Sequence, residues 1–216
     1  MAGIDFFDVD HTITRRSSGA RFIFLAMRKG VLPLRLLLIF PFYSLQYRLG
    51  LYKPREYSEG FPSLAGMTRD SLTGIARESF ESKLKGDVYA GAAAVIAERR
   101  AAGRRVALAT SSVDIIVEPL ARYLGVDDVL ATVLEFRDGI CTGKFVGQPM
   151  FRAEKMTRVT QFIAAAGGTP AECGFYSDSI YDLPLLQAIG SPVAVNPDFR
   201  LRRIALRRGW PVIDLS

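Results

Sequence analysis

Short apolar runs rich in β-branched and aromatic residues alternate along this chain with longer segments whose apolar positions recur every three or four residues. The short runs predict strands and the periodic segments predict helices. The predicted strands span residues 4–9, 105–109, 128–134, 174–177, 192–195 and 211–213, and the predicted helices span 90–102, 113–124, 154–166 and 182–188. This alternation predicts an α/β fold in which a parallel sheet carries helices on its faces.

Two stretches depart from the alternation. Residues 13–86 are mostly helical in pattern, so we expect a helical insert there. Residues 132–145 hold Asp138 and Gly139 between two extended runs, a pair that favours the tight turn of a β-hairpin. At 216 residues the chain is long enough for one core with a small appended domain.

Charge is distributed unevenly along the chain. The formal net charge is +6, yet the segment between Asp10 and Glu56 contains nine basic residues and no acidic one. A second basic run near the C-terminus comprises Arg200, Arg202, Arg203, Arg207 and Arg208. Such segments attract anions, whether a phosphorylated metabolite, a lipid headgroup or a nucleic acid backbone.

The cysteines and the N-terminal residues indicate in which cellular compartment the protein is expected. Cys141 and Cys173 have neither the spacing of a metal site nor that of a redox motif, which favours a reducing environment. The chain begins with an acidic strand rather than with a basic segment before an apolar one, so we expect no secretory signal. The prediction is a cytoplasmic protein.

Two aspartates follow directly from the first predicted strand. Side chains in a strand alternate between its faces, so Asp8 and Asp10 emerge on the same side. They lie at the carboxyl end of the strand, where ligands of open α/β sheets gather. Because two carboxylates aimed at one point repel each other unless a cation lies between them, the pair indicates a cation at this edge.

Three further segments place polar residues at comparable positions. The strand predicted over 105–109 runs into Thr110, Ser111 and Ser112; Lys155 opens a predicted helix; and the strand predicted over 174–177 runs into Asp178, with Asp182 four residues on. Together with the segment from Asp8 to Thr12, these four motifs resemble, in order, those of the haloacid dehalogenase superfamily. The similarity covers nearly the whole chain, and the long motif around Asp178 is similar to the subfamily that contains phosphoserine phosphatase.

This resemblance implies a fold, a division of the chain and a reaction. Residues 1–13 and 87–216 would form a Rossmann-like core, and residues 14–86 would form a helical cap of type C1 between the first and second motifs. The reaction implied is Mg²⁺-dependent hydrolysis of a phosphomonoester through an aspartyl phosphate intermediate. A dehalogenase is disfavoured, because that branch does not need the second acid that Asp10 supplies.

The resemblance also implies residue roles. Asp8 would attack phosphorus, and Asp10 would protonate the leaving oxygen and then activate water. Mg²⁺ would be bound by Asp8, the backbone carbonyl of Asp10 and Asp178. The residues that would hold the phosphate or support the metal are Thr12, Thr110, Ser111, Lys155 and Asp182.

At two positions the chain departs from the family pattern. His11 and Ser177 stand where glycine is commoner. We expect His11 to shape its loop without a catalytic part. We expect Ser177 to leave a working loop while narrowing the space for the phosphate.

Residues 31–47 are apolar for most of their length, interrupted by Pro33, Arg35 and Pro41. Three interpretations stay open: a cap helix buried against the core or against a second subunit of a homodimer, a helix lying on the inner face of a membrane, and a membrane span. The apolar, basic cap resembles that of bacterial phosphatidylglycerophosphate phosphatases. A lysophospholipid or other lipid phosphate therefore joins small phosphorylated metabolites as a substrate class, and a nucleic acid partner is not expected.

The absence of an acidic residue between Asp10 and Glu56 affects which substrate is expected. Phosphoserine phosphatases carry an acidic residue soon after the first motif to hold the substrate ammonium, whereas here none precedes Glu56, which weakens phosphoserine as the substrate. Two other functions stay open. One is a phosphotransferase with the same intermediate, and the other is a catalytically silent module that binds membranes or other anions through its basic cap.

Overall fold

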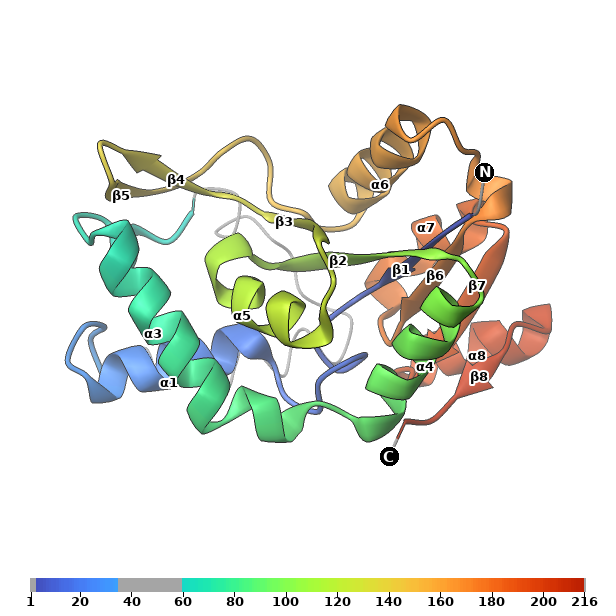
Figure 1. Ribbon diagram of the computed structural model, residues 1–216, viewed down its shortest axis with the longest axis horizontal. Helices are drawn as coiled ribbons and strands as arrows, with labels where there is room; N and C mark the ends of the chain where they lie inside the picture. Colours follow the sequence, from blue (N-terminus) through green and yellow to red (C-terminus); the bar gives the residue numbers. More distant parts are fainter. Residues whose placement is uncertain (1–2, 35–59, 216) are drawn as a thin grey trace.

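A six-stranded parallel sheet forms the centre of the computed structural model, which describes residues 3–34 and 60–215 (Figure 1). The strands are β1 (Ile4–Phe7), β2 (Arg105–Val113), β3 (Asp128–Thr132), β6 (Gly174–Ser177), β7 (Ser191–Val195) and β8 (Val212–Ile213). They lie in the order β3-β2-β1-β6-β7-β8, and every neighbouring pair is parallel. The predicted α/β fold class is confirmed, and β1 lies between β2 and β6.

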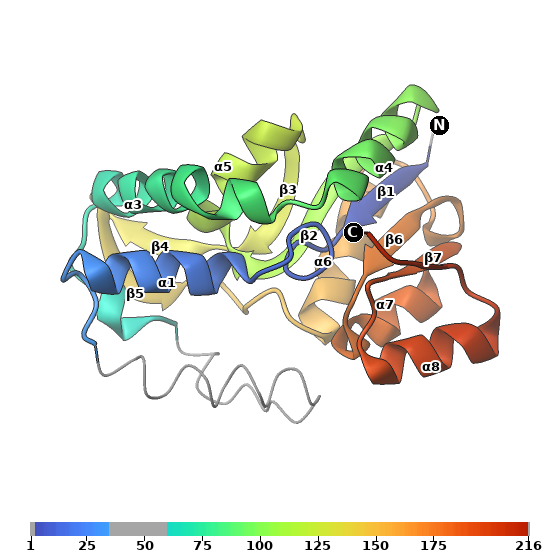
Figure 2. The same cartoon turned by 90° about the horizontal axis from the view of Figure 1, so that it is seen from below.

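Helices cover both faces of this sheet (Figures 1 and 2). The helices are α4 (Ala90–Ala101), α5 (Asp114–Leu124), α6 (Ala153–Ala165), α7 (Leu183–Ala188) and α8 (Phe199–Arg208). Because β1 alternates its side chains, Phe7 packs with α4 and α5, while Ile4 and Phe6 pack with α6, α7 and α8. Both faces of the sheet are therefore buried, as expected for parallel strands.

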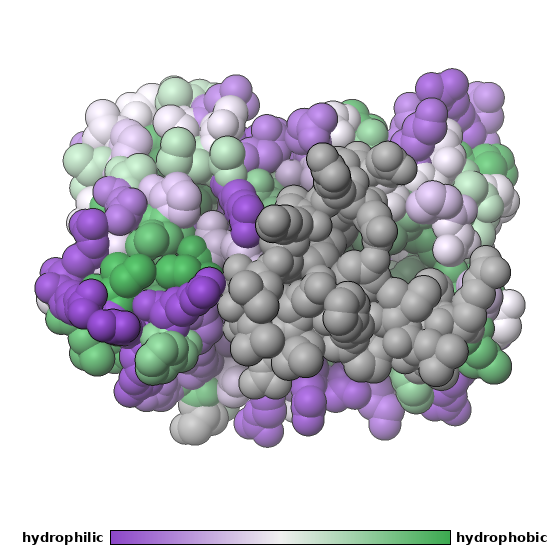
Figure 3. Space-filling view, turned by 180° about the vertical axis from the view of Figure 1, so that it is seen from behind, coloured by the Kyte–Doolittle hydropathy of each residue, from purple (hydrophilic) through white to green (hydrophobic). Residues whose placement is uncertain are grey.

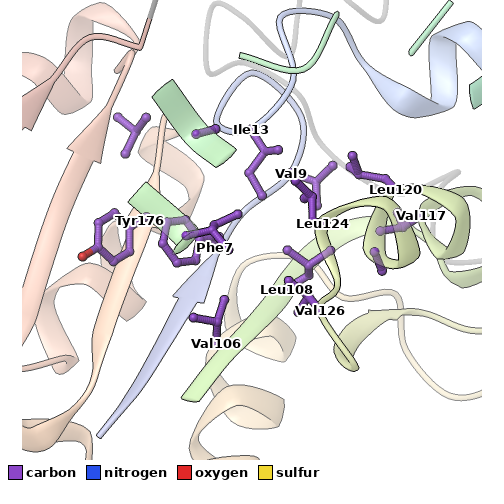
Figure 4. Close-up of a cluster of buried hydrophobic side chains, with 14 of the residues drawn as sticks. Phe7, Val9, Ile13, Val106, Leu108, Val117, Leu120, Leu124, Val126 and Tyr176 are labelled. Carbon is purple, nitrogen blue, oxygen red and sulfur yellow. The ribbon is translucent and has the colours of Figure 1, made fainter. Parts of the chain in front are cut away.

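The core on one face fixes the carboxyl end of β1 (Figure 4). The Phe7 ring stacks on the Tyr176 ring of β6, with 4.2 Å between centroids and 11° between planes. Val9 and Ile13, which follow β1, are fully buried beside Leu108 of β2. The loop that carries the first aspartates is thus anchored by apolar side chains on either side of them.

The regular elements of the insert after β1 are helices in the residues that the structure describes. The insert contains α1 (Ser18–Arg28), η2 (Pro62–Leu64), α3 (Arg69–Ser82) and η3 (Leu84–Asp87). A separate apolar cluster packs α1 and α3 against the start of α5 and against a hairpin of β4 (Leu134–Arg137) and β5 (Ile140–Phe145). The predicted helical character and the predicted hairpin are confirmed.

The two connections between insert and sheet run side by side. Thr14 bridges to Val88, the Arg15 N–H donates to the Asp87 carbonyl at 2.7 Å, and the Arg21 guanidinium pairs with the Asp87 carboxylate at 2.7 Å. Chain entry and exit therefore meet at one place, next to the carboxyl end of β1.

Most of the apolar segment 31–47 lies outside the described residues, so its three interpretations stay predictions. In the part of the chain that the structure covers, no helix has the length and apolar character needed to cross a bilayer. Whether the cap pairs two subunits also stays a prediction.

Several strand boundaries differ from the predicted ones. Strand β1 ends at Phe7 rather than at residue 9, and β7 and β8 each begin one residue away from the predicted start. Strand β2 continues past residue 109 to Val113, because Val113 still pairs with Thr132 after an irregular step in the ladder. The run predicted as a single strand over 128–134 breaks at Val133, and the Leu134 N–H donates to the Asp114 carboxylate at 3.3 Å. Smaller helical turns are η4 (Pro170–Glu172) and η5 (Ile180–Asp182).

Two adjacent arginines provide a test of how burial sets the strength of an ion pair. Arg104 binds Asp5 with two hydrogen bonds of 2.8 and 2.6 Å, and Arg105 binds Asp128 with two of 2.6 Å. Asp5 is 2% exposed, whereas the Arg105 and Asp128 side chains are 46% and 24% exposed. Replacing Arg104 therefore leaves a buried carboxylate unpaired.

We expect Arg104→Ala to lower the free energy of unfolding by about 3 kcal/mol, measured by urea denaturation, because its partner stays buried. We expect Arg105→Ala to lower it by about 1 kcal/mol, since solvent screens that pair. Equal losses for the two variants would contradict this reasoning.

Candidate active site

The predicted site residues meet at the carboxyl edge of three neighbouring strands. Asp8 follows β1, and its N–H donates to the Tyr176 carbonyl of β6 at 2.9 Å, so the β1–β6 ladder extends to this residue. Asp178 follows β6, and Thr110 lies within β2 on the other side of β1. Residues more than 150 positions apart in sequence are therefore neighbours in space.

Lys155 connects two of the aspartates. It lies in the first turn of α6, is 3% exposed, and donates from Nζ to Asp8 Oδ1 at 2.9 Å and to Asp182 Oδ2 at 2.7 Å. Both carboxylates are buried, at 4% and 5% exposure. Each of these buried carboxylates is less costly to bury beside the ammonium than it would be without a cationic partner.

Burial and mutual repulsion shift the pKa values of the acidic side chains in this cluster. Burial, opposed by the charge of Lys155 and reinforced by that of Asp182, raises the pKa of Asp8 to about 7. Burial and the charge of Asp8 raise the pKa of Asp178 well above its ordinary value. Burial alone would lower the pKa of Lys155, but the carboxylates of Asp182 and Asp8 raise it. The cluster thus holds more carboxylates than one ammonium can neutralise.

Ser177 completes the environment of Asp182. It is fully buried, and its Oγ donates to Asp182 Oδ2 at 2.7 Å, the same oxygen that accepts from Lys155. The Ser179 N–H in turn donates to Ser177 Oγ at 3.1 Å. The hydroxyl that stands where glycine is commoner therefore fixes the orientation of the Asp182 carboxylate.

Thr12 and His11 shape the loop after β1. Thr12 Oγ1 donates to Asp178 Oδ1 at 3.2 Å and accepts from the Asp178 N–H at 2.9 Å, so it joins the first and fourth motifs. His11 has φ of 65°, in the left-handed region where glycine is least strained. This backbone angle explains why glycine is common at that position, and the Asn196 amide donates to the His11 carbonyl at 3.4 Å.

Asp10 belongs to a second hydrogen-bond network. Its carboxylate accepts from Ser17 Oγ at 2.9 Å and from the Ser18 N–H at 2.8 Å, at the start of α1. Ser18 Oγ lies 2.9 Å from Ser112 Oγ, and the Ser112 N–H donates to Thr110 Oγ1 at 3.1 Å. The network joins the first motif, the cap and the second motif.

Sequence reasoning missed Ser17 and Ser18 as partners of Asp10. The sequence does contain a signal for them, since a serine directly before a segment with helical apolar periodicity is a typical helix N-cap.

Ser111, predicted among the substrate-binding residues, is half-buried next to Thr110, and its carbonyl accepts from Thr132 Oγ1 at 2.8 Å.

The oxygen atoms around Asp8 and Asp178 are of the kind that bind a metal ion. Within residues 3–34 and 60–215, no three acidic, histidine or cysteine side chains are already grouped as ligands, because Asp182 binds Lys155 and Asp10 faces α1. Asp8 and Asp178 stay as buried, mutually repelling carboxylates, and Asp10 follows Asp8 by two residues. Two such carboxylates and a carbonyl suit Mg²⁺, which prefers oxygen ligands and keeps several waters.

Comparison with known proteins assigns the chain to a family. Residues 6–187 match the model of the haloacid dehalogenase-like hydrolases. The chain belongs to this family. The predicted membership is confirmed, and with it the assignment as an enzyme of the hydrolase class.

Individual members of the haloacid dehalogenase-like family are similar over most of the chain. A probable phosphatase of Mycobacterium tuberculosis is 34% identical over 98% of this chain and 75% of its own length. A histidinol-phosphatase of Neisseria meningitidis is 33% identical over 71% of each chain. Each of these two relatives is similar over more than two thirds of this chain.

Solved structures give the same fold. A protein of unknown function from Bordetella pertussis has a TM-score of 0.88 at 31% identity, covering 100% of both chains. A phosphoserine phosphatase in the form of a phospho-aspartyl intermediate analogue has a TM-score of 0.66 at 16% identity, covering 99% of this chain and 93% of that one. At 16% identity the second likeness concerns the fold alone.

The raised pKa of Asp8 gives a prediction about Mg²⁺ and pH. The pKa of this carboxyl is 3.8 in the unfolded chain and about 7 in the metal-free fold, so the folded state binds more protons across this window and its stability falls as pH rises. Mg²⁺ that binds ionised Asp8 competes with that proton.

We therefore expect Mg²⁺ to raise the melting temperature more at about pH 8 than at about pH 5.5, by about 3 °C for each kcal/mol of binding free energy. Differential scanning fluorimetry measures both values, and Asp8→Asn should reduce the difference between them, with Asp178 accounting for what is left. Equal stabilisation at the two pH values would contradict the assignment of Asp8 as a ligand.

Proposed function

We propose that this protein is a Mg²⁺-dependent phosphatase that hydrolyses a phosphomonoester through an aspartyl phosphate on Asp8. The observation that carries the proposal is the buried contact of Lys155 with Asp8 and Asp182 at 2.9 and 2.7 Å. Among the described residues, Lys155 is the only hydrogen-bond donor to the Asp8 carboxylate, and it uses Oδ1. The other oxygen, Oδ2, is then left for attack on phosphorus.

The reaction divides into two displacements. Asp8 Oδ2 forms a bond to phosphorus as the bond from phosphorus to the ester oxygen breaks, and Asp10 gives its proton to the departing oxygen. Water then attacks the phosphoryl group, Asp10 takes the proton from that water, and phosphate leaves as the Asp8 carboxylate is restored. The contacts of Asp10 with Ser17 and Ser18 would orient it for both proton transfers.

The remaining residues would bind and orient the phosphoryl group. Lys155 would bind a phosphoryl oxygen while keeping Asp8 in place, and Thr110 would donate from its hydroxyl on the opposite side. Asp8, the Asp10 carbonyl and Asp178 would hold Mg²⁺, which when bound offsets the negative charge of the phosphate and of the attacking carboxylate. Thr12 would hold Asp178 through the two hydrogen bonds that join them.

The substrate class we propose is a small phosphorylated metabolite, with a lysophospholipid or other lipid phosphate as the alternative. Phosphatase names among the relatives, including a histidinol-phosphatase, support the first class. The basic and apolar sequence of residues 14–55 supports the second. A screen of phosphorylated amino acids, amino alcohols, sugars and lysophospholipids would separate them.

Asp8→Asn tests the reaction itself. We expect the variant to release phosphate from a generic aryl phosphate at least about a thousandfold more slowly than the wild type, because an amide cannot act as the nucleophile. The matched control is Asp127→Asn, since Asp127 is an exposed aspartate away from the site. A wild type that releases no phosphate in the presence of Mg²⁺ would instead favour the silent anion-binding module.

Ser177→Ala tests the positioning of Asp182. Loss of one hydrogen bond to this carboxylate removes about 1 kcal/mol of orientation energy, so we expect kcat to fall about fivefold with little change in KM. Steady-state kinetics on the same aryl phosphate measures both constants. A fall in KM with an unchanged kcat would mean that the Ser177 hydroxyl only crowds the phosphate.

A further inference from the structure

Helix α8 presents an exposed face that the site described above does not use. Leu201 and Ala205 face the core and are fully buried, and Ile204 is half-buried beside them, so the opposite side of the helix faces outward. Phe199 and Leu206 are 80% and 66% exposed, although both are large and apolar. The exposed positions between and beside them are arginines, namely Arg200, Arg202, Arg203, Arg207 and Arg208.

This face contains a shallow groove that is lined by both apolar and cationic side chains. The groove of about 410 Å³ is lined by Ile180, Phe199, Arg200, Arg203, Ile204 and Arg207. Figure 3 shows it at the left, where α8 lies, as an apolar area rimmed by hydrophilic side chains. An apolar floor with a cationic rim is suited to a ligand that is itself both apolar and anionic.

Two arginines of this face, Arg203 and Arg207, form no ion pair with the residues that the structure describes. Arg202 reaches Asp214 only at 3.4 Å on the surface. Arg208 lies over the Trp210 ring, 5.4 Å from its centroid. Cations that the fold leaves in solvent beside exposed phenylalanine and leucine are available to an external anion.

We propose that the outer face of α8 binds the surface of an anionic phospholipid membrane. Arginines near such a surface are attracted by its negative potential, and Phe199 and Leu206 enter the boundary between headgroups and acyl chains. Both features are required together, since a nucleic acid backbone would use the arginines but offers no apolar layer for Leu206. The inference stands independently of the proposed hydrolysis.

The position of α8 connects this face to the candidate active site. Asp198, the N-cap of α8, accepts from the Ile180 N–H at 2.7 Å, and its own N–H donates to the Asp178 carbonyl at 2.8 Å. The proposed membrane face therefore begins directly behind the Asp178 loop. Docking through α8 would hold the site at the lipid surface, where an amphiphilic phosphomonoester resides.

Vesicle sedimentation tests the proposal on the full chain. We expect the wild type to sediment with vesicles of phosphatidylglycerol and phosphatidylcholine but not with vesicles of phosphatidylcholine alone. Arg203→Glu/Arg207→Glu should lower the fraction bound at least about tenfold, because it replaces attraction by repulsion. Phe199→Ser/Leu206→Ser should also weaken binding, with the salt dependence retained.

The matched control is Arg77→Glu/Lys83→Glu, which makes the same charge change at exposed positions of α3 and its C-cap. Figures 1 and 2 show α3 and α8 at opposite ends of the molecule. The control should bind vesicles like the wild type. All three double variants should keep the circular dichroism spectrum and the melting temperature of the wild type, which shows that they are folded.

Three results would overturn the proposal. The first is equal binding to anionic and neutral vesicles, or to neither. The second is binding that survives Arg203→Glu/Arg207→Glu or falls equally in the control, since the contact would then lie elsewhere or depend only on net charge. The third is tighter binding to a DNA oligonucleotide than to anionic vesicles.

Discussion

One buried ammonium, that of Lys155, determines how this site is built. Asp8 follows β1, Asp182 closes η5, and Lys155 begins α6, so its two hydrogen bonds join three separate parts of the chain. Each carboxylate would be costly to bury without a cation. Because Lys155 is 3% exposed, it has no alternative partner in bulk water, and the orientation of both acids depends on it.

The single ammonium of Lys155 cannot neutralise the negative charge of all the carboxylates around it. Asp8, Asp178 and Asp182 are all buried, and this burial, reinforced by repulsion between the carboxylates, raises the pKa values of Asp8 and Asp178. A fold that keeps this imbalance is poised for an additional cation and for a ligand that brings its own negative charge to that cation. The second network, from Asp10 through Ser18 to Ser112, places the start of the cap beside this charged cluster.

Much of this arrangement could be predicted from the sequence, because it depends on local pattern. Period-two strands alternating with helices predict a parallel sheet, and polar residues at strand ends then have to meet at one edge. The resemblance to the family motifs supplied the roles that we propose for Asp8, Asp10, Thr110 and Lys155. The position of the helical insert followed from periodicity alone, although most of residues 31–47 lie outside the described residues.

Other features depend on tertiary contacts and had no local signal. The Ser177 hydroxyl was expected near the phosphate, but it donates to Asp182, a partner that only the turn of η5 brings within reach. Strand β2 extends to Val113 because β3 continues to pair with it. The exposure of Phe199 could not be predicted either, since an amphipathic pattern does not tell which apolar residues of a helix face the core.

The measurement that tests the central claim most directly is the identification of a phosphorylated residue during turnover. The wild type would be mixed with excess substrate and Mg²⁺, quenched in acid, digested with pepsin and analysed by mass spectrometry. The account predicts one additional phosphoryl group on the peptide that contains Asp8, removed by hydroxylamine as expected for an acyl phosphate. Rapid turnover with the phosphoryl group on another residue would contradict it.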